Sequence, residues 1–296
     1  MKILITGADG QLGRSLQDCA PAMINDEYNI VIPVGKKFFD ITKKQHVHEQ
    51  LEKIKPNIII NSAAYTAVDK AETEKDEANQ LNFHGVENLI DWCNKNDCVI
   101  VHISTDFVFN GDQSVAYKPS DETAPLNQYG KTKLAGELAL TSSQCSHYII
   151  RTGWVYSEHG NNFVKSILRL ATCKTSLGVV ADQLGTPTYA AHLAQMIWRL
   201  IEDRPEKKLW HFSDAGTASW YDFATAIIEE AVPMGLLQKS IPVKPITTSD
   251  YPTPAVRPRF SLLDKEQTWK ELYITPVHWR VALRGMLARL IDQGKV

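Results

Sequence analysis

The sequence predicts an α/β protein built on a Rossmann-type, doubly wound parallel sheet with a smaller C-terminal α/β lobe. Short apolar runs alternate with longer amphipathic stretches through the first half of the chain, which is the pattern of βαβ units. A glycine-rich segment directly follows the first apolar run. Beyond Arg151 the alternation loosens and helical patterns predominate, which indicates a second, smaller lobe.

Length and composition narrow the class of protein. The chain has 296 residues, of which 44% are hydrophobic and 22% charged, enough for one large α/β unit or two coupled domains. No apolar run approaches the roughly 20 residues that span a bilayer, so we expect no membrane partner. The 32 basic and 34 acidic residues give no positive field for nucleic acid. Five cysteines without a CxxC pair predict free thiols and a cytoplasmic location.

The expected elements follow from these patterns in chain order. We expect one helical stretch at Asp76–Asn96, where apolar residues keep a helical spacing. Residues 1–152 should form an NAD(P)-binding Rossmann domain and residues 153–296 the smaller lobe, with the chain free to cross between them. In the first lobe we expect strands at Lys2–Thr6, Asn29–Val34, Ile58–Asn61, Val99–Ser104 and Tyr148–Arg151. In the second we expect helices at Asn162–Cys173, Tyr189–Ile201, Trp220–Ala231 and Trp279–Asp292, and isolated strands near Leu209–Phe212 and Pro242–Ile246.

The glycine-rich segment predicts a dinucleotide site. Gly7, Gly10 and Gly13 follow the first strand and open a helix with the spacing GxxGxxG. Such glycines make a tight turn and bring backbone N–H groups against a pyrophosphate at the helix N-terminus. The position of the motif in the first βα unit favours a cofactor site over a plain turn.

The end of the second strand bears on cofactor choice. A carboxylate there would bind the ribose 2′-OH of NAD, but this strand ends in Val34-Gly35-Lys36-Lys37. Ammonium groups suit a 2′-phosphate better, although exposed lysines are equally well explained as solvated surface. Asp40 follows shortly and could accept from the cofactor instead. We therefore expect NADPH as the cofactor, with NADH use left open.

A Tyr-Lys pair predicts carbonyl reduction. Tyr129 and Lys133 are spaced by four residues at the start of a predicted helix, so they share one face. Thr105 ends the fourth strand, on the side where ligands bind in such sheets. A phenol could give its proton to a carbonyl oxygen while Thr105 holds that oxygen. We expect the Lys133 ammonium and an oxidised nicotinamide to favour the phenolate and bring the pKa of Tyr129 closer to the working pH. No metal is needed for this chemistry.

Together these residues resemble the extended short-chain dehydrogenase/reductase superfamily, which combines the GxxGxxG turn, a Ser or Thr on the fourth strand and YxxxK. Finer segments, spread from Lys2 to about Trp279, look like the dTDP-4-dehydrorhamnose reductase family. These are residues 61–72 (NSAAYTAVDKAE), 104–109 (STDFVF), 125–130 (PLNQYG), 151–156 (RTGWVY), 160–163 (GNNF), 182–188 (DQLGTPT) and 251–258 (YPTPAVRP).

The resemblance assigns roles to individual residues. It implies Thr105, Tyr129 and Lys133 as catalytic residues, with Tyr129 and Lys133 also touching the cofactor. It further implies sugar-nucleotide contacts at Val68, Thr105, Asp106 and Trp154. Cofactor contacts are implied at Gly10, Gln11, Leu12, Asp40, Ala63, Ala64 and Tyr65, beside the Gly7, Gly13 and Lys36 of the motifs above.

The sequence also departs from the family pattern. Asn110 stands where an acid is usual, and Gly153 replaces a common Ser. Some members dimerise through a magnesium ion held partly near the start of the first helix, where this chain has Ser15, so we expect no metal site. The chain should be a monomer or a homodimer.

The resemblance implies reduction of the C4 keto group of dTDP-4-dehydro-L-rhamnose to dTDP-L-rhamnose. Two alternatives stay open: another nucleotide-sugar 4-ketoreductase or epimerase, and a non-catalytic NADP-binding subunit resembling the methionine adenosyltransferase β subunit. A 4,6-dehydratase is disfavoured because Asp106 is followed by Phe107 rather than by Glu. The proline-rich loop 251–258 restricts Arg257, whose guanidinium fork matches a diphosphate; capping of a helix end is the alternative for this residue.

Overall fold

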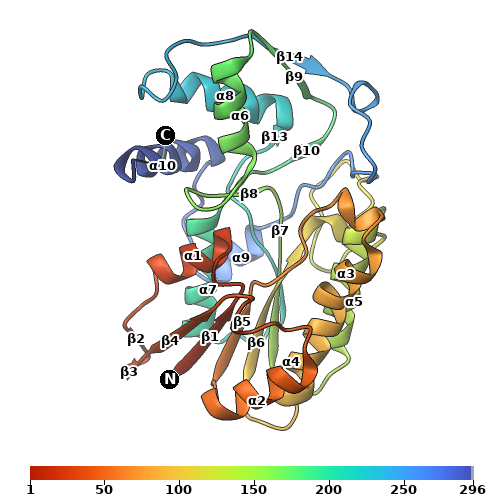
Figure 1. Cartoon of the computed structure of the whole chain (residues 1–296), viewed down its shortest axis with the longest axis vertical. Coiled ribbons are helices and arrows are strands. Elements are labelled where there is room, and N and C mark those ends of the chain that lie inside the picture. Colours follow the sequence, from red (N-terminus) through yellow and green to blue (C-terminus); the bar gives the residue numbers. More distant parts are fainter. Residues whose placement is uncertain (295–296) are drawn as a thin grey trace.

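A six-stranded parallel sheet forms the lower part of the molecule (Figure 1). This computed structural model describes residues 1–294. The strand order is β12-β7-β6-β5-β1-β4, and all five pairings are parallel, so the predicted doubly wound sheet is confirmed. The strands are β1 (Lys2–Thr6), β4 (Ile30–Val34), β5 (Ile58–Asn61), β6 (Val99–Thr105), β7 (His147–Thr152) and β12 (Leu209–His211).

Helices cover both faces of this sheet because its strands are apolar on both sides. In β1, Ile3 and Ile5 pack into the core under α1 (Gln11–Asp18) and α7 (Ala190–Asp203). Leu4 points the other way, into the core under three further helices. Those helices are α2 (Lys44–Ile54), α4 (Gly85–Cys93) and α5 (Gln128–Thr141).

The smaller lobe lies above the sheet in Figure 1 and has its own apolar core. Asn162 caps α6 through its side chain, as expected for a residue that precedes a helix. No helix among residues 1–294 is long and apolar enough to cross a bilayer. The lobe contains α6 (Phe163–Cys173), α8 (Trp220–Ala231) and α10 (Trp279–Asp292), with the strand pairs β9 (Leu177–Val180) and β14 (Val243–Ile246), β8 (Val155–Tyr156) and β11 (Thr188–Tyr189), and β10 (Leu184–Gly185) and β13 (Ala218–Ser219).

The prediction that Leu209–Phe212 forms an isolated strand of the smaller lobe is wrong. β12 pairs in parallel with β7, with Leu209 opposite Ile149, and becomes an edge of the main sheet. Its preceding helix α7 packs against α1, so the chain returns to the first lobe through a helical crossover. Division into residues 1–152 and 153–296, with crossing between the lobes, stays a prediction.

The stretch predicted as a single helix at Asp76–Asn96 contains a local irregularity. It begins as α3 (Lys75–Asn79), widens to a π-helical segment at Gln80–His84 and continues as α4. Inside the wide segment, the Asn82 side chain bonds the backbone of Tyr65 at both its oxygen and its nitrogen, at 2.8 and 3.1 Å. A π-bulge of this kind re-aims a side chain without ending the helix.

A buried ion pair fixes α5 against the sheet. Arg151 of β7 and Glu137 of α5 are 4% and 3% exposed, and the guanidinium meets the carboxylate through Nε at 3.0 Å and Nη2 at 2.7 Å. Ser104 of β6 donates to the same carboxylate. The guanidinium also lies 5.1 Å from the centre of the Phe109 ring. Both charges are therefore paired and held in a fixed geometry.

We predict that Glu137→Gln destabilises the fold by about 3–5 kcal/mol, because it leaves the buried Arg151 charge without its partner. Urea unfolding measures the change. Glu202→Gln is the matched control, since it removes one partner of the half-exposed Arg199–Glu202 pair and should cost about 1 kcal/mol or less. Equal losses for the two variants would contradict the importance of the buried pair.

Candidate active site

The glycine-rich turn after β1 has the backbone geometry that a dinucleotide site needs. Gly7 has a φ of +65°, and a Cβ there would lie 2.7 Å from the backbone nitrogen of Ala63. A Cβ on Gly13 would lie 2.4 Å from the Gly7 carbonyl oxygen. Only glycine fits at both places, so the turn brings α1 close to the sheet.

A cavity of about 240 Å³ lies beside this turn, where the strand order reverses around β1. Ligands of open α/β sheets bind at such a switch point. The exposed Lys36 lines the cavity together with Asp40, which accepts from the backbone and hydroxyl of Thr42. Of the predicted cofactor residues, the cavity gathers Gly7, Gly10, Lys36, Asp40, Ala63 and Ala64.

Four other predicted cofactor residues do not line this cavity, although they lie close to its lining residues in the sequence. Leu12 is buried in the core. Gly13 allows α1 to pack closely against the turn at Gly7. The Gln11 carboxamide accepts from Asn162 at 2.9 Å, which ties α1 to the smaller lobe. The Tyr65 phenol donates to Glu74, which raises the pKa of Tyr65 to about 12.

The predicted catalytic residues converge at the carboxyl end of β6. Thr105 ends the strand, and Tyr129 lies in the first turn of α5, which the Asn127 side chain caps. The Thr105 hydroxyl interacts with the Tyr129 phenol and also donates to Asp106 at 3.1 Å. Burial raises the pKa of Tyr129 to about 12, with Thr105 opposing and Asp106 adding to the shift.

The expectation that Lys133 and an oxidised nicotinamide together favour the phenolate stays a prediction. Lys133 is 1% exposed, and its Nζ donates to the Ile103 carbonyl at 2.6 Å and contacts His102 Nε2 at 3.2 Å. Burial lowers the pKa of Lys133 to about 8, partly opposed by Glu137. Within residues 1–294 no hydrogen bond joins Lys133 to Tyr129. Without a cofactor, burial favours the protonated form of the Tyr129 phenol.

Asp106 is a buried carboxylate beside the catalytic pair. It is 3% exposed, and burial raises its pKa to about 6, although hydrogen bonds from Ser261 and Thr105 oppose the shift. The departure at Gly153 has a physical reason here, since a Cβ at that residue would lie 2.6 Å from the carboxylate. Asn110 is the other residue that departs from the family pattern, and its side-chain oxygen accepts from the Tyr117 hydroxyl at 2.9 Å.

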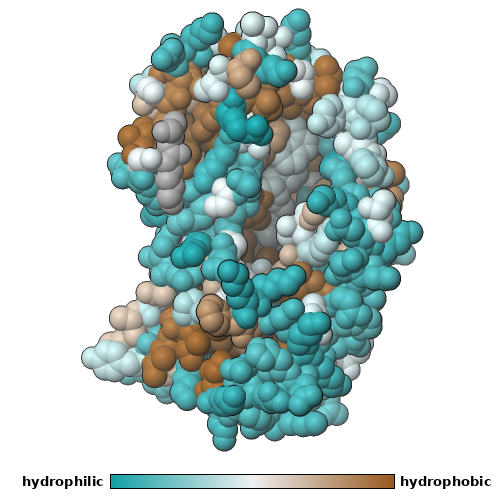
Figure 2. All heavy atoms as spheres, in the orientation of Figure 1, coloured by the Kyte–Doolittle hydropathy of each residue, from teal (hydrophilic) through white to brown (hydrophobic). Residues whose placement is uncertain are grey.

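A second cavity, of about 440 Å³, is lined by residues of the smaller lobe together with Asp69 of the first. On the face drawn in Figure 2 the surface is hollowed between the upper and lower parts of the molecule. Arg257 lines the cavity, but it does not cap a helix. Its two terminal nitrogens meet the Asp69 carboxylate at 3.0 and 2.8 Å, which holds the pKa of Asp69 below its usual value.

Trp154 is half-buried and is not among the residues that line this cavity. Its indole stacks on Trp220 at 3.5 Å, nearly parallel, and a Cβ on Gly185 would lie 2.8 Å from it. Its backbone is left-handed, with a φ of +52°, a strained conformation typical of functional sites. Trp220 and Phe163 line the 440 Å³ cavity in its place, and the sequence analysis missed both because each resembled an ordinary helix residue. Val68 is half-buried and is not among the lining residues.

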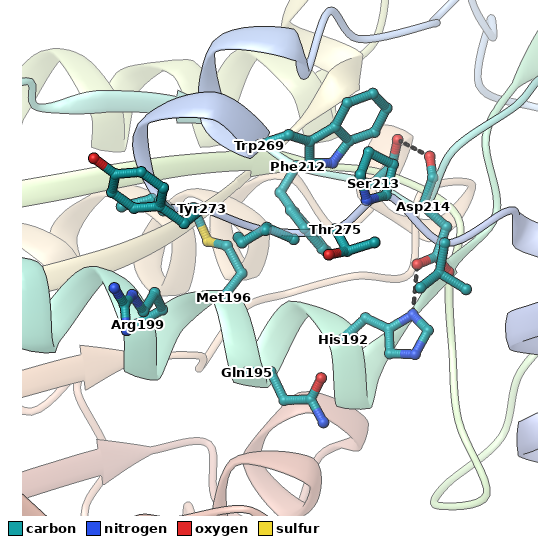
Figure 3. Close-up of a pocket in the computed structure, with 14 residues that line it drawn as sticks. His192, Gln195, Met196, Arg199, Phe212, Ser213, Asp214, Trp269, Tyr273 and Thr275 are labelled. Carbon is teal, nitrogen blue, oxygen red and sulfur yellow. Dashed lines mark hydrogen bonds and ion pairs between the residues drawn. The ribbon is translucent and has the colours of Figure 1, made fainter.

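A third cavity, of about 380 Å³, lies elsewhere in the molecule (Figure 3). His192 and Arg199 of α7 form one wall, and Trp269 of α9 (Glu266–Glu271) forms another. His192 Nδ1 pairs with the buried Asp214 at 2.6 Å. None of the predicted site residues lines this cavity, so it is separate from the candidate active site.

One group of three possible metal ligands occurs among the described residues. Ligand atoms of Asp18, Glu158 and His159 lie within 4.8 Å of one another. They already have partners, because His159 pairs with Asp18 at 2.6 Å and Arg289 with Glu158 at 3.1 Å. The expected lack of a metal site stays a prediction.

Comparison with known proteins identifies the family. The model of the RmlD substrate binding domain matches residues 1–291. The chain is 42% identical over 292 residues to a dTDP-4-dehydrorhamnose reductase of Aggregatibacter actinomycetemcomitans, covering 97% of this chain and 98% of the relative. The chain belongs to the dTDP-4-dehydrorhamnose reductase family. The resemblance inferred from the motifs is thereby confirmed.

Solved structures of dTDP-4-dehydrorhamnose reductases have the same fold. One from Clostridium acetobutylicum matches with a TM-score of 0.89 at 37% identity, over 100% of both chains. Another, from Bacillus anthracis and in complex with NADP, matches with a TM-score of 0.89 at 36% identity, over 97% of this chain and 99% of that one. A UDP-glucose 4-epimerase of Thermus thermophilus, at 17% identity, shares the fold alone.

We predict that Asp106→Asn stabilises the chain above pH 6. The folded-state pKa of about 6 lies above the ordinary value of 3.8. The favourable contribution of protonated Asp106 is therefore complete below pH 3.8 and lost as the pH rises through 6. The difference between these two pKa values corresponds to roughly 3 kcal/mol, so urea unfolding should show that gain at pH 8 and little gain at pH 4. Asp112→Asn, at an exposed position, is the control, and equal gains at both pH values would contradict the prediction.

Proposed function

We propose that the chain uses NADPH to reduce the C4 keto group of dTDP-4-dehydro-L-rhamnose, giving dTDP-L-rhamnose. The family and the names of its members support this activity. The observation that carries the proposal is the contact between the Thr105 hydroxyl and the half-buried, protonated Tyr129 phenol at the carboxyl end of β6. A ketone oxygen between these two hydroxyls would meet both a proton donor and a second hydrogen-bonding group.

The geometry supports one division of roles. Bound NADPH supplies the hydride. Tyr129 gives its phenolic proton to the oxygen at C4, and its high pKa ensures that this proton is present at neutral pH. Thr105 holds the oxygen in place. Lys133, fixed by the Ile103 carbonyl, provides a nearby positive charge for the phenolate that remains.

We assign the cofactor to the 240 Å³ cavity and the turn beside it. Gly7, Gly10 and Gly13 allow backbone N–H groups at the start of α1 to meet the pyrophosphate. Lys36 favours the 2′-phosphate of NADPH, while Asp40 on the same cavity leaves room for NADH. The remaining cofactor contacts are proposed at Gln11, Leu12, Ala63, Ala64, Tyr65, Tyr129 and Lys133.

We assign the sugar nucleotide to the side of the site formed with the smaller lobe. Asp106 and Thr105 would meet the sugar, with Val68 and Trp154 close by. Arg257 would turn part of its fork from Asp69 to the diphosphate. The chain would act in the cytoplasm as a monomer or a homodimer.

Spectrophotometry tests the activity directly. NADPH oxidation at 340 nm is followed with dTDP-4-dehydrorhamnose, generated from the glucose nucleotide in situ, and the product is identified by chromatography. Stoichiometric NADPH consumption with rhamnose formation supports the proposal. A product epimerised without net NADPH consumption, or no turnover despite cofactor binding, would refute it.

We predict that Tyr129→Phe lowers kcat by about 10²–10⁴-fold, the usual contribution of a positioned general acid. NADPH affinity, measured by fluorescence titration, should change little because the phenyl ring keeps its packing against Phe107. A variant with near-unchanged kcat would remove Tyr129 from the role of proton donor.

A further prediction concerns the diphosphate. Arg257→Lys keeps the charge but loses the two-pronged geometry, so the KM for the sugar nucleotide should rise about tenfold while the KM for NADPH stays within twofold, because one charge-assisted hydrogen bond is worth about 1.5–3 kcal/mol. Arg259→Lys, at an exposed position two residues away, is the matched control. An increase confined to the NADPH KM, or a lower melting temperature without a kinetic effect, would make Arg257 a structural residue.

A further inference from the structure

A row of buried polar side chains runs across three strands toward Lys133. Thr6 of β1, Asn61 of β5 and His102 of β6 are paired neighbours in the sheet register, so their side chains share one face. The Thr6 hydroxyl donates to the Asn61 oxygen at 2.7 Å, and the Asn61 nitrogen lies 3.1 Å from His102 Nδ1. His102 Nε2 then lies 3.2 Å from Lys133 Nζ.

The row is closed to solvent along its length. Thr6 and His102 are 0% exposed, and Asn61 and Lys133 are each 1% exposed. Because the far end is a buried hydroxyl, the row does not carry protons to bulk water. Both ring nitrogens of His102 have partners, as in an ordinary core histidine, but one of those partners is Lys133.

The row can satisfy Lys133 in either charge state. As placed, Asn61 donates to His102 Nδ1, so the ring proton resides on Nε2, where a neutral amine can accept it. An ammonium group has only donors, so it needs His102 Nε2 as an acceptor. The ring proton must then reside on Nδ1. A half-turn of the nearly symmetrical Asn61 carboxamide allows this tautomer. The Asn61 oxygen then accepts from His102 Nδ1, and the Asn61 nitrogen donates to the Thr6 hydroxyl.

We propose that His102 is a positioning residue for catalysis, which holds Lys133 Nζ in place for Tyr129 while Asn61 and Thr6 set the tautomer of its ring. The proposal rests on the proposed function and adds a residue to it. His102 does not touch the reacting atoms. It acts by giving Lys133 a second fixed partner besides the Ile103 carbonyl, so that the ammonium is held from two directions.

Charges around the row are consistent with a neutral imidazole. Burial lowers the pKa of His102 well below its usual value, with Lys133 and then His147 of β7 adding to the shift. On the α5 side, the Glu137 carboxylate partly opposes the lowering of the Lys133 pKa, and Arg151 already pairs with that carboxylate. The ring therefore stays an uncharged partner over the working pH range.

The test compares His102→Phe with His102→Gln. The Gln side chain carries an amide that can still reach Lys133 Nζ. In the Phe variant we expect kcat to fall about 10–100-fold, the loss typical of a displaced catalytic group. The limb of the kcat profile that falls above about pH 8 should also move to lower pH, because the lost hydrogen bond is stronger to the charged Lys133 ammonium than to the neutral amine. The Gln variant should recover most of kcat and the original limb.

His211→Phe is the matched control. His211 is also 0% exposed in the same sheet, and it contacts Arg151 and the Tyr117 carbonyl rather than Lys133. It should lower the melting temperature without moving the pH limb. Should His102→Phe fail to fold, His102→Asn replaces it, since that amide is too short to meet Lys133.

The proposal is overturned if His102→Phe or His102→Asn keeps the parent pH limb and differs only in melting temperature. It is also overturned if Gln behaves like Phe. Turnover by the unaltered chain tests the proposed function separately. The role of His102 is tested only by the ratio of each variant's kcat to that of the parent. NADPH affinity across the same pH range gives a second readout, and it should weaken in the Phe variant but not in the His211 control.

Discussion

The pairing of Glu137 with Arg151 constrains the whole catalytic arrangement. Tyr129, Lys133 and Glu137 are spaced by four residues, so they occupy one face of α5. Once Glu137 is locked to β7 and to Ser104, that face cannot rotate away from the carboxyl end of β6. The pair therefore fixes the positions of the two groups to which we assign the chemistry, in addition to neutralising its own charges.

Burial acts in opposite directions on the two titrating groups of the site. It raises the pKa of Tyr129 and lowers that of Lys133, because in each case it disfavours the charged form. The raised pKa favours a protonated phenol at neutral pH in the proposed proton donor, and burial lowers the pKa of Lys133 to about 8. Neither shift follows from the YxxxK spacing, which predicted proximity of the two side chains and a lower tyrosine pKa.

Local patterns made much of the fold predictable. The apolar runs at β1 and β5 and the glycines at 7 and 13 are determined by neighbouring residues, and all were identified from the sequence. The partner of β12, the Trp154–Trp220 stack and the Arg257–Asp69 pair join residues far apart in the chain. The spacing of apolar residues along the sequence does not predict such long-range pairs. The π-helical segment at Gln80–His84 was also missed, since its apolar spacing is that of an ordinary helix.

The return of the chain to the main sheet through α7 and β12 has a consequence for biosynthesis. Until residue 211 has left the ribosome, β7 is an open sheet edge and the apolar faces of Leu16 and Ile150 lack the cover that α7 provides. The part of the smaller lobe that runs from β8 to β11 is thus made before the main sheet is finished. A fragment ending at residue 152 would expose the same surfaces permanently, so the two lobes depend on one polypeptide to mature together.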